Sequence, residues 1–297
     1  MDLPPGLTAR PLRMEDAEAV FRLMETSEEH DVGEAAIDLE DVVGDWQRPS
    51  FHLATQSVGV VGDGRLVAYA EVVNGRYADA TVLPSWRGRG IGTWLAAWTQ
   101  AEARRQGGSM VGMPVPFGSD GDRLLESLGY EVAWTSWVLE LPRGAVIEPQ
   151  PLPDGYAVRG FQPGEERVVY QVVEDAFNEW PDRAPVPVAD WEARVIRRPG
   201  FEPWHLRVVT ERTGVVVGVG WVLPSRDSGY VMALAVRKDE RGRGLARALL
   251  ADCFAVSREA GMARAELSTD SRTGALGLYE RVGMEITQVW LHRAIAV

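Results

Sequence analysis

Two glycine-rich stretches decide how this chain is built: RGRGIG at residues 87–92 and RGRGLA at residues 241–246. The second follows the first by 154 residues. Another pair of similar stretches, LLESLGY at 124–130 and LYERVGM at 278–284, has the same spacing. Two matches at one spacing indicate two copies of one domain rather than a solenoid of short repeats.

The starts of the two copies also match, at residues 8–12 and 157–161, with a spacing of 149. We expect the five-residue difference to lie in loops. Between the copies, residues 141–155 contain four prolines, which disfavour helices and central strands alike. The chain of 297 residues therefore divides into two expected domains, 1–145 and 155–297.

Hydrophobic periodicity predicts a mixed order of strands and helices in each copy. In the first copy the expected strands are 7–11, 51–61, 66–73, 77–83, 110–114 and 133–140, and the expected helices are 15–26, 91–105 and 120–128. In the second copy the expected strands are a hairpin within 206–223 and strands 230–236, 264–269 and 286–294. The expected helices of this copy are 245–260 and 274–282. This order predicts an α/β fold in which each domain has a mixed sheet flanked by helices.

The composition excludes several classes of function. The chain has 43 acidic and 31 basic residues, a net charge of −12, which argues against binding nucleic acid or anionic lipid. The acidic charge either attracts a cationic substrate or only keeps the protein in solution. The single cysteine, Cys253, and four scattered histidines do not form a metal site. With no signal peptide or membrane-length apolar stretch, we expect a cytoplasmic protein without bound metal or membrane contact.

Each glycine-rich stretch lies between an apolar strand and a helix. Backbone N–H groups and the helix dipole favour an anion at such a place, and glycines let the backbone approach it. The arginines that could neutralise a diphosphate there are Arg87, Arg89, Arg241 and Arg243. The alternative is an ordinary strand-to-helix turn with solvated arginines.

In residues 82–92, 236–246 and 275–284 the chain resembles the GNAT superfamily of N-acyltransferases. The resemblance implies two tandem GNAT domains, each with a twisted sheet whose fourth and fifth strands splay apart. Acyl-CoA would lie in that gap, with its pyrophosphate on the glycine-rich loop and its pantetheine along the fourth strand. The tandem layout is also similar to that of the mycothiol synthase family. The residues implied to bind acetyl-CoA are Thr81, Val82, Leu83, Arg87, Gly88, Arg89, Gly90, Ile91 and Gly92 in the first copy and Leu234, Ala235, Val236, Arg241, Gly242, Arg243, Gly244, Leu245 and Ala246 in the second.

The same resemblance implies that Tyr279 is the acid that protonates the leaving CoA thiolate. The alternative is a core tyrosine whose hydroxyl is satisfied within the fold. The matching residue of the first copy is Leu125, so that copy is expected to be degenerate and the second to be catalytic. The residue that acts as the base and deprotonates the amine is not identified by the sequence. Its candidates are Asp79 in the first copy and Glu174, Asp175, Glu179 and Asp227 in the second.

Four tryptophans of the second copy either line an acceptor pocket or belong to the core: Trp180, Trp191, Trp204 and Trp221. The expected function is transfer of an acetyl group from acetyl-CoA to a small-molecule or peptide amine, by direct attack in a ternary complex. A narrower alternative is acetylation of an amino-thiol conjugate, as in the mycothiol synthase family. An alternative of another class is a non-catalytic acyl-CoA-binding or scaffolding protein.

Overall fold

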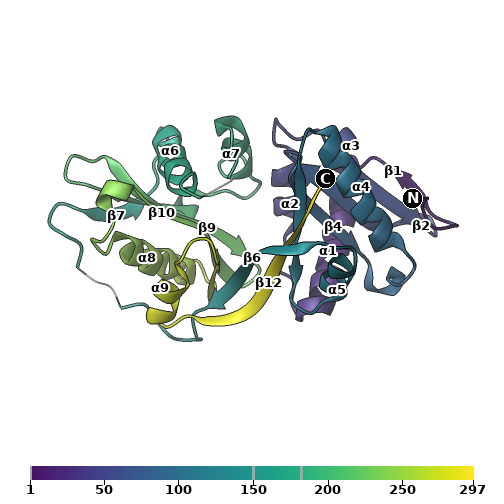
Figure 1. Cartoon of the computed structure of the whole chain (residues 1–297). Coiled ribbons are helices and arrows are strands. Elements are labelled where there is room, and N and C mark those ends of the chain that lie inside the picture. Colours follow the sequence, from purple (N-terminus) through teal and green to yellow (C-terminus); the bar gives the residue numbers. More distant parts are fainter. Residues whose placement is uncertain (1, 149–150, 181–182) are drawn as a thin grey trace. The chain divides into compact units, whose positions relative to one another are not determined.

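The computed structural model describes residues 2–148, 151–180 and 183–297, and the chain forms two compact units (Figure 1). Unit 1 comprises Met1–Ser136 together with Gln288–Val297, and unit 2 comprises Trp137–Thr287. In each unit helices cover a mixed sheet of parallel and antiparallel strands, which confirms the expected class of fold. Among the described residues no helix is both long and apolar enough to cross a membrane.

The strands of unit 1 follow the order β1-β2-β3-β4-β5-β12. They are β1 (Thr8–Arg10), β2 (Ser57–Gly62), β3 (Arg65–Val73), β4 (Tyr77–Val82), β5 (Met110–Pro116) and the C-terminal part of β12 (Glu285–Ala296). The helices are η1 (Met14–Asp16), α1 (Ala17–Val32), α2 (Leu39–Trp46), α3 (Leu53–Gln56), η2 (Pro84–Trp86), α4 (Ile91–Arg105) and α5 (Asp120–Ser127). Side chains alternate along β3, so Tyr69 packs with α1 and α2 while Ala68 and Ala70 pack with α4.

The strands of unit 2 follow the order β7-β8-β9-β10-β11-β6. They are β6 (Glu131–Glu140), β7 (Ala157–Gly160), β8 (Leu206–Thr210), β9 (Val216–Ser225), β10 (Ser228–Val236) and β11 (Arg264–Asp270). The helices are α6 (Glu166–Phe177), α7 (Val188–Arg194), η3 (Pro203–His205), η4 (Lys238–Glu240), α8 (Leu245–Glu259) and α9 (Leu276–Arg281). Val208 and Val219 pack with α6, whereas Val209 and Val217 pack with α8. Figure 1 accordingly shows α6 and α8 on opposite sides of this sheet.

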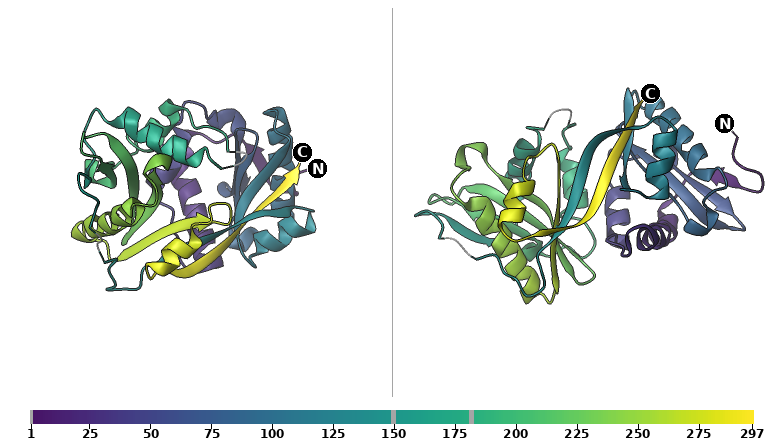
Figure 2. Two further views of the ribbon diagram at one scale, coloured as in Figure 1. Left: turned by 60° about the vertical axis from the view of Figure 1, so that its left-hand side comes forward. Right: turned by 60° about the horizontal axis from the view of Figure 1, so that its bottom comes forward.

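The last strand of each sequence repeat enters the other unit. Residues 137–140 of β6 belong to unit 2, where the Leu141 N–H donates to the Ala265 carbonyl at 2.9 Å. The end of β12, yellow in Figure 2, pairs antiparallel with β5 in unit 1, from Trp290 opposite Pro116 onward. The expected domains of 1–145 and 155–297 follow the repeat, whereas the compact units exchange these strands.

A buried ion pair fixes the exchanged strand β12 within unit 1. The Arg293 guanidinium donates to the Asp122 carboxylate at 2.5 Å and to the Tyr130 carbonyl at 3.1 Å. Both charged side chains are less than a tenth exposed. Removing one partner of such a pair leaves a buried charge without compensation. Side-chain contacts of Arg293 therefore hold β12 in unit 1 in addition to the backbone hydrogen bonds with β5.

The difference in length between the repeats lies mainly in a hairpin. In unit 1 Val82 of β4 lies opposite Ala68 of β3, whereas in unit 2 Val236 lies opposite Gly218. The spacing between equivalent residues of the two copies is thus 150 on the first strand of the hairpin and 154 on the second. Four of the five additional residues therefore extend the β9–β10 hairpin, and our expectation that they lie in loops was wrong.

Two further predictions differ from the structure. Helices α2 and α7 were not expected, because each is shorter than three turns and its apolar period is brief. The predicted strand 51–61 was wrong at its start, where Leu53–Gln56 forms the helical turn α3. The Gln56 side chain stabilises that turn by accepting a hydrogen bond from the His52 N–H at 2.6 Å.

Candidate active site

The central strands of each sheet splay apart. In unit 2, β10 pairs parallel with β11 from Ser228 to Val231 and pairs antiparallel with β9 as far as Val236. A bulge at Met232 marks the point where β10 leaves β11. In unit 1 the parallel pairing of β4 with β5 is registered at Tyr77. The splayed strands implied by the resemblance are therefore confirmed, and each unit has a central strand with one open edge.

Hydrogen bonds decide which residues of β10 face the open edge. The Arg237 N–H donates to the Val217 carbonyl of β9 at 2.9 Å. Because successive residues of a strand point their backbone groups to opposite sides, Ala235 also faces β9. Leu234 and Val236 then present their backbone groups to the gap. Of the three backbone contacts expected in unit 2, these two are available to a ligand.

The equivalent strand of unit 1 follows the same rule. The Leu83 N–H donates to the Val67 carbonyl at 2.9 Å, so Leu83 and Thr81 face β3. Val82 faces the open edge. The expected contacts through the amides of Thr81 and Leu83 are therefore not available, and Val82 is the residue of that set that a ligand could reach.

The glycine-rich loops have nearly the same backbone conformation in both units. Gly88 and Gly90 have φ values of +73° and +84°, and Gly242 and Gly244 have φ values of +76° and +79°. Only glycine adopts this left-handed region without strain. Gly90 and Gly244 each cap a helix, α4 and α8, whose first N–H groups lack intrahelical partners. Both loops therefore offer a site for an anion.

The first arginine of each loop holds the loop in place. Arg87 donates to the Val82 carbonyl at 3.2 Å and to Asp31 at 2.6 and 2.8 Å. Arg241 donates to the Val236 carbonyl at 3.1 Å and to the Glu179 carboxylate at 3.0 and 2.9 Å. Both guanidinium groups are committed to carboxylates of their own unit. We had expected them to neutralise a diphosphate, and the structure instead gives them a role in positioning the loop.

The second arginine of each loop is more exposed. Arg89 stacks over the Trp86 ring at 4.5 Å from its centroid. Arg243 donates to the Tyr156 hydroxyl at 2.7 Å and lies 3.4 Å from the Glu240 carboxylate, and its side chain is 47% exposed. These two arginines remain placed to meet a phosphate.

Three other expected binding residues have packing roles. Ile91 and Leu245, the first residues of α4 and α8, are each 1% exposed. At Gly92 a Cβ atom would lie 2.6 Å from Leu124, so glycine allows α4 to approach α5. Their backbone N–H groups still belong to the first helical turn, as does that of Ala246.

Tyr279 lies on α9 in unit 2 and is 8% exposed. Its hydroxyl makes no hydrogen bond to residues 2–148, 151–180 or 183–297. Burial raises the pKa of Tyr279 to about 12. By contrast, the hydroxyl of Tyr130 in unit 1 bonds to Gln100 at 3.3 Å. Tyr279 is thus a buried phenol with a free donor, and Leu125, its counterpart on α5, is a core residue.

The candidate bases of unit 2 are mostly engaged. Glu174 accepts hydrogen bonds from Arg183 and from the Val186 N–H, and Glu179 pairs with Arg241. Asp175 accepts from the neighbouring Gln171. Asp227 is exposed in the β9–β10 turn. None of these described contacts singles out one of the four carboxylates as the base.

The four tryptophans of unit 2 do not form one wall. Trp191 and Trp221 pack in the cluster beneath α6, and Trp204 packs against a separate cluster beneath α8. Trp180 lies under the Arg272 guanidinium at 5.2 Å. Their role is mainly in packing.

Sequence reasoning missed the partner of Asp79. Glu71 on β3 lies directly opposite Asp79 on β4, and it is 9% exposed. A single acidic residue in the apolar stretch LVAYAEVV was the available signal. In unit 2 the same cross-strand pair is Trp221 opposite Ala233. The two units therefore differ in the chemistry of this position as well as at Tyr279.

Comparison with known proteins agrees with this geometry. Residues 167–284 match the Acetyltransferase (GNAT) family. The chain is 30% identical over 253 residues to the mycothiol acetyltransferase of Salinispora tropica, covering 79% of this chain and 78% of that protein. It is 29% identical to the mycothiol acetyltransferase of Actinosynnema mirum, covering 91% and 92%.

Solved structures show the same fold over the whole chain. A GCN5-related N-acetyltransferase from Sphaerobacter thermophilus is 31% identical, with a TM-score of 0.77 and coverage of 99% of this chain and 97% of that one. A tandem GNAT protein from the clavulanic acid biosynthesis pathway is 18% identical, with a TM-score of 0.73 and coverage of 98% of both chains. At that identity the second likeness concerns the fold alone.

Proposed function

The chain belongs to the GNAT family of acetyltransferases, and on that premise we propose that unit 2 transfers the acetyl group of acetyl-CoA to a primary amine. The observation that carries this assignment is Tyr279, a buried phenol whose hydroxyl has no partner among the described residues. It lies in the unit that also has a splayed strand and an open glycine-rich loop.

The donor would occupy the gap beside β10. N–H groups of the first turn of α8, together with Arg243, would meet the pyrophosphate. The backbone groups of Leu234 and the N–H of Val236 would hold the pantetheine and the thioester, since the Val236 carbonyl already accepts from Arg241. Arg241 would act through the loop, because its guanidinium already bonds Val236 and Glu179.

The reaction would proceed by direct attack. The neutral amine forms a C–N bond to the thioester carbonyl carbon, and a backbone N–H at the open edge of β10 stabilises the resulting oxyanion. The C–S bond then breaks, and the sulfur takes the proton of Tyr279, which regains one from water. Water carries away the amine proton. Because the pKa of Tyr279 is raised to about 12, the phenol stays protonated at neutral pH.

Two relatives named mycothiol acetyltransferase suggest the acceptor class. We propose that it is the primary amine of an amino-thiol conjugate. Unit 1 retains the glycine-rich loop but has Leu125 in place of the phenol, which favours acyl-CoA binding without turnover there.

The test is release of CoA thiol from acetyl-CoA by the full chain with a panel of amines. The panel contains alkylamines, amino sugars, an amino-thiol conjugate and a peptide with a free N-terminus. We expect amine-dependent release that is fastest with the amino-thiol conjugate. Release no faster than the hydrolysis rate with every amine would contradict the proposed function. Faster release with another amine would contradict only the acceptor class.

A further inference from the structure

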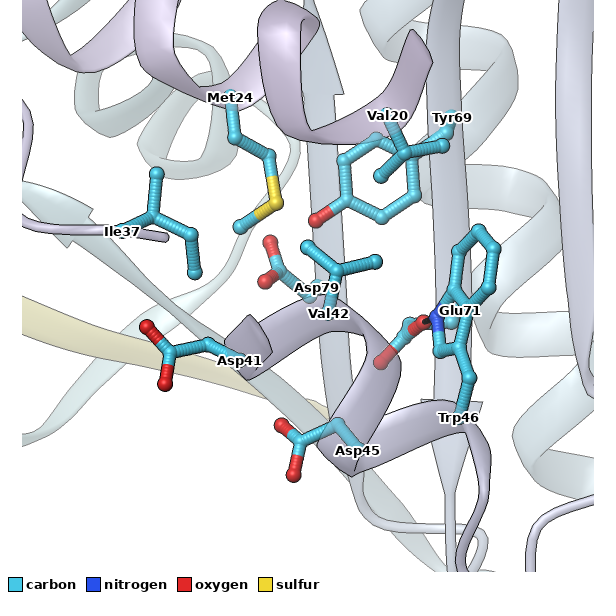
Figure 3. Close-up of a pocket in the computed structure, with 10 residues that line it drawn as sticks. All are labelled: Val20, Met24, Ile37, Asp41, Val42, Asp45, Trp46, Tyr69, Glu71 and Asp79. Carbon is cyan, nitrogen blue, oxygen red and sulfur yellow. Dashed lines mark hydrogen bonds between the residues drawn. The ribbon is translucent and has the colours of Figure 1, made fainter. Parts of the chain in front are cut away.

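Unit 1 contains a pocket of about 70 Å³ between its sheet and the helices α1 and α2 (Figure 3). Val20 and Met24 of α1 and Val42 of α2 form an apolar wall. The volume accommodates a small organic group. Tyr279 belongs to unit 2, whereas every residue that lines this pocket belongs to unit 1.

The polar side of the pocket is acidic. Asp41 and Asp45 reach it from α2, Glu71 from β3 and Asp79 from β4, and Figure 3 shows the four carboxyl groups around one space. Glu71 and Asp79 are direct cross-strand neighbours, so their side chains share one face of the sheet. Two like charges this close oppose each other, and the pair tends to retain a proton.

Burial reinforces this effect. Desolvation, together with the charges of Asp79 and Asp45, raises the pKa of Glu71 to about 8. Desolvation also raises the pKa of Asp79, although the Tyr69 hydroxyl donates a hydrogen bond to it. The pair therefore carries less negative charge than two free carboxylates at neutral pH, and a bound cation could take the place of the retained proton.

Only one of the two carboxylate oxygens of Glu71 has a hydrogen-bond donor among the described residues. One of its carboxylate oxygens accepts a hydrogen bond from the Trp46 indole N–H at 2.8 Å. The other oxygen has no hydrogen-bond donor among the residues that the structure describes, and it faces the pocket in Figure 3. A side chain that is 91% buried gains from a donor at such an oxygen.

The surroundings favour an organic cation. In the described parts of the chain no three or more His, Cys, Asp or Glu side chains are placed to share a metal ion. The apolar wall of α1 and α2 suits the carbon stem of an alkylamine. An ammonium group supplies three N–H donors and a positive charge, which match the open oxygen of Glu71 and the adjacent Asp79.

We propose that unit 1 binds the ammonium group of a primary amine in this pocket, with Glu71 and Asp79 as its anionic partners. The amine enters already protonated and displaces the proton held by the pair. Asp41 and Asp45 of α2 and Tyr69 of β3 line the pocket with the pair. The charge of Arg48 after α2 acts on Glu71, and the charge of Glu28 of α1 acts on Tyr69. Unit 2 has Trp221 and Ala233 at the same place and offers no such pair.

The indole N–H of Trp46 reports on this site because it donates to Glu71. The full chain, labelled with ¹⁵N, is titrated with methylammonium chloride at constant ionic strength. Trp46→Phe identifies the Trp46 resonance as the one that disappears. We expect a saturable shift of this resonance. Glu71→Gln keeps an acceptor for the indole but removes the charge, and it should weaken binding by about tenfold or more.

Glu102→Gln is the matched control, because Glu102 is a buried acid of unit 1 that pairs with Arg105 outside the pocket. It should bind methylammonium like the wild type. Tetramethylammonium, which has no N–H donor, should cause no saturable shift. The proposal is overturned if methylammonium gives no saturable shift, if Glu71→Gln binds it as tightly as the wild type, or if calcium or tetramethylammonium binds equally well.

This readout requires no turnover. Tyr279→Phe should leave the titration unchanged, so a failure of the amine pocket is distinct from a failure of the reaction proposed for unit 2. A titration that changed in Tyr279→Phe would contradict a site formed by residues of unit 1 alone.

Discussion

Glu71 links the packing of unit 1 to pH. Its pKa in the folded chain is about 8, compared with an ordinary value of 4.5, because the carboxyl group is buried beside Asp79. Between these values the folded state holds more protons than the unfolded state, so the free energy of unfolding should fall as pH rises. Glu71→Gln should flatten this dependence, as measured by urea unfolding at pH 5, 7 and 8.5.

Glu102→Gln serves as the control for that series, because it also removes a buried acid from unit 1. It should leave the fall between pH 5 and pH 8.5 in place. The assignment to Glu71 is wrong if both variants show the same pH dependence as the wild type.

At the scale of elements, the glycine-rich loop of unit 2 assigns different tasks to its two arginines. Arg243 is exposed near the start of α8, so Arg243→Ala should raise the Kd for acetyl-CoA by about tenfold through loss of a charge-assisted contact. Arg241→Ala should raise it as well and also lower the melting temperature, because the tie to Glu179 and Val236 is lost. Calorimetric titration and thermal unfolding measure the two effects.

Arg237 provides the control for these variants, since its exposed side chain pairs with Asp239. Arg237→Ala should leave the Kd for acetyl-CoA unchanged. An unaltered Kd in Arg243→Ala would show that this loop does not receive the pyrophosphate.

The strand β5 has a glycine where β12 approaches most closely. A Cβ atom at Gly112 would lie 2.8 Å from the Arg293 carbonyl and 2.7 Å from the His292 ring. Gly112→Ala should therefore push β12 away and destabilise the protein by about 1–3 kcal/mol. Gly121→Ala, in α5 of the same unit, meets its nearest neighbour at 3.3 Å and should be tolerated. Equal stability of the two variants in urea would contradict the close contact.

The sequence was sufficient to predict the long helices and strands and the two glycine-rich loops. The helices that follow the glycine-rich loops were expected, because apolar period and glycine position are local signals. The splayed strands were implied by the resemblance to the GNAT superfamily. Helix α2 was not expected, because Leu39–Trp46 is only about two turns long and shows too little apolar periodicity. The pair of Glu71 and Asp79 is created by strand pairing, and no local pattern connects two residues eight positions apart across a hairpin.

At the scale of the whole molecule, the exchange of strands should make the two repeats depend on each other. A fragment ending near residue 150 lacks the segment of β12 that pairs with β5, and the complementary fragment lacks residues 137–141 of unit 2. Each fragment expressed alone should be unfolded or aggregated, whereas co-expressed fragments should form a soluble 1:1 complex. Gel filtration and circular dichroism test this, and two stable, monomeric fragments would contradict it.

This exchange could not be predicted from the repeat. The final strands of both copies have similar apolar patterns, so either could complete either sheet. Specific contacts decide the outcome, such as the buried pair of Arg293 and Asp122, which are 171 positions apart in the chain. The motifs of the candidate site were predicted from the sequence. The roles of Arg87 and Arg241 were not, because their carboxylate partners are distant in the sequence, and both arginines were therefore expected to bind phosphate.

The central claim is that Tyr279 is the acid of an acetyl transfer in unit 2. The most direct test measures kcat and melting temperature of Tyr279→Phe on one preparation, with Tyr170→Phe as the control, because the Tyr170 hydroxyl bonds only the Val186 carbonyl among the described residues. We expect Tyr279→Phe to lower kcat by about 10²-fold with little change in melting temperature. The loss should be the same at pH 7 and pH 9.5, since the phenol stays protonated across that range. A wild-type kcat with a lowered melting temperature would contradict the account and make Tyr279 a core residue.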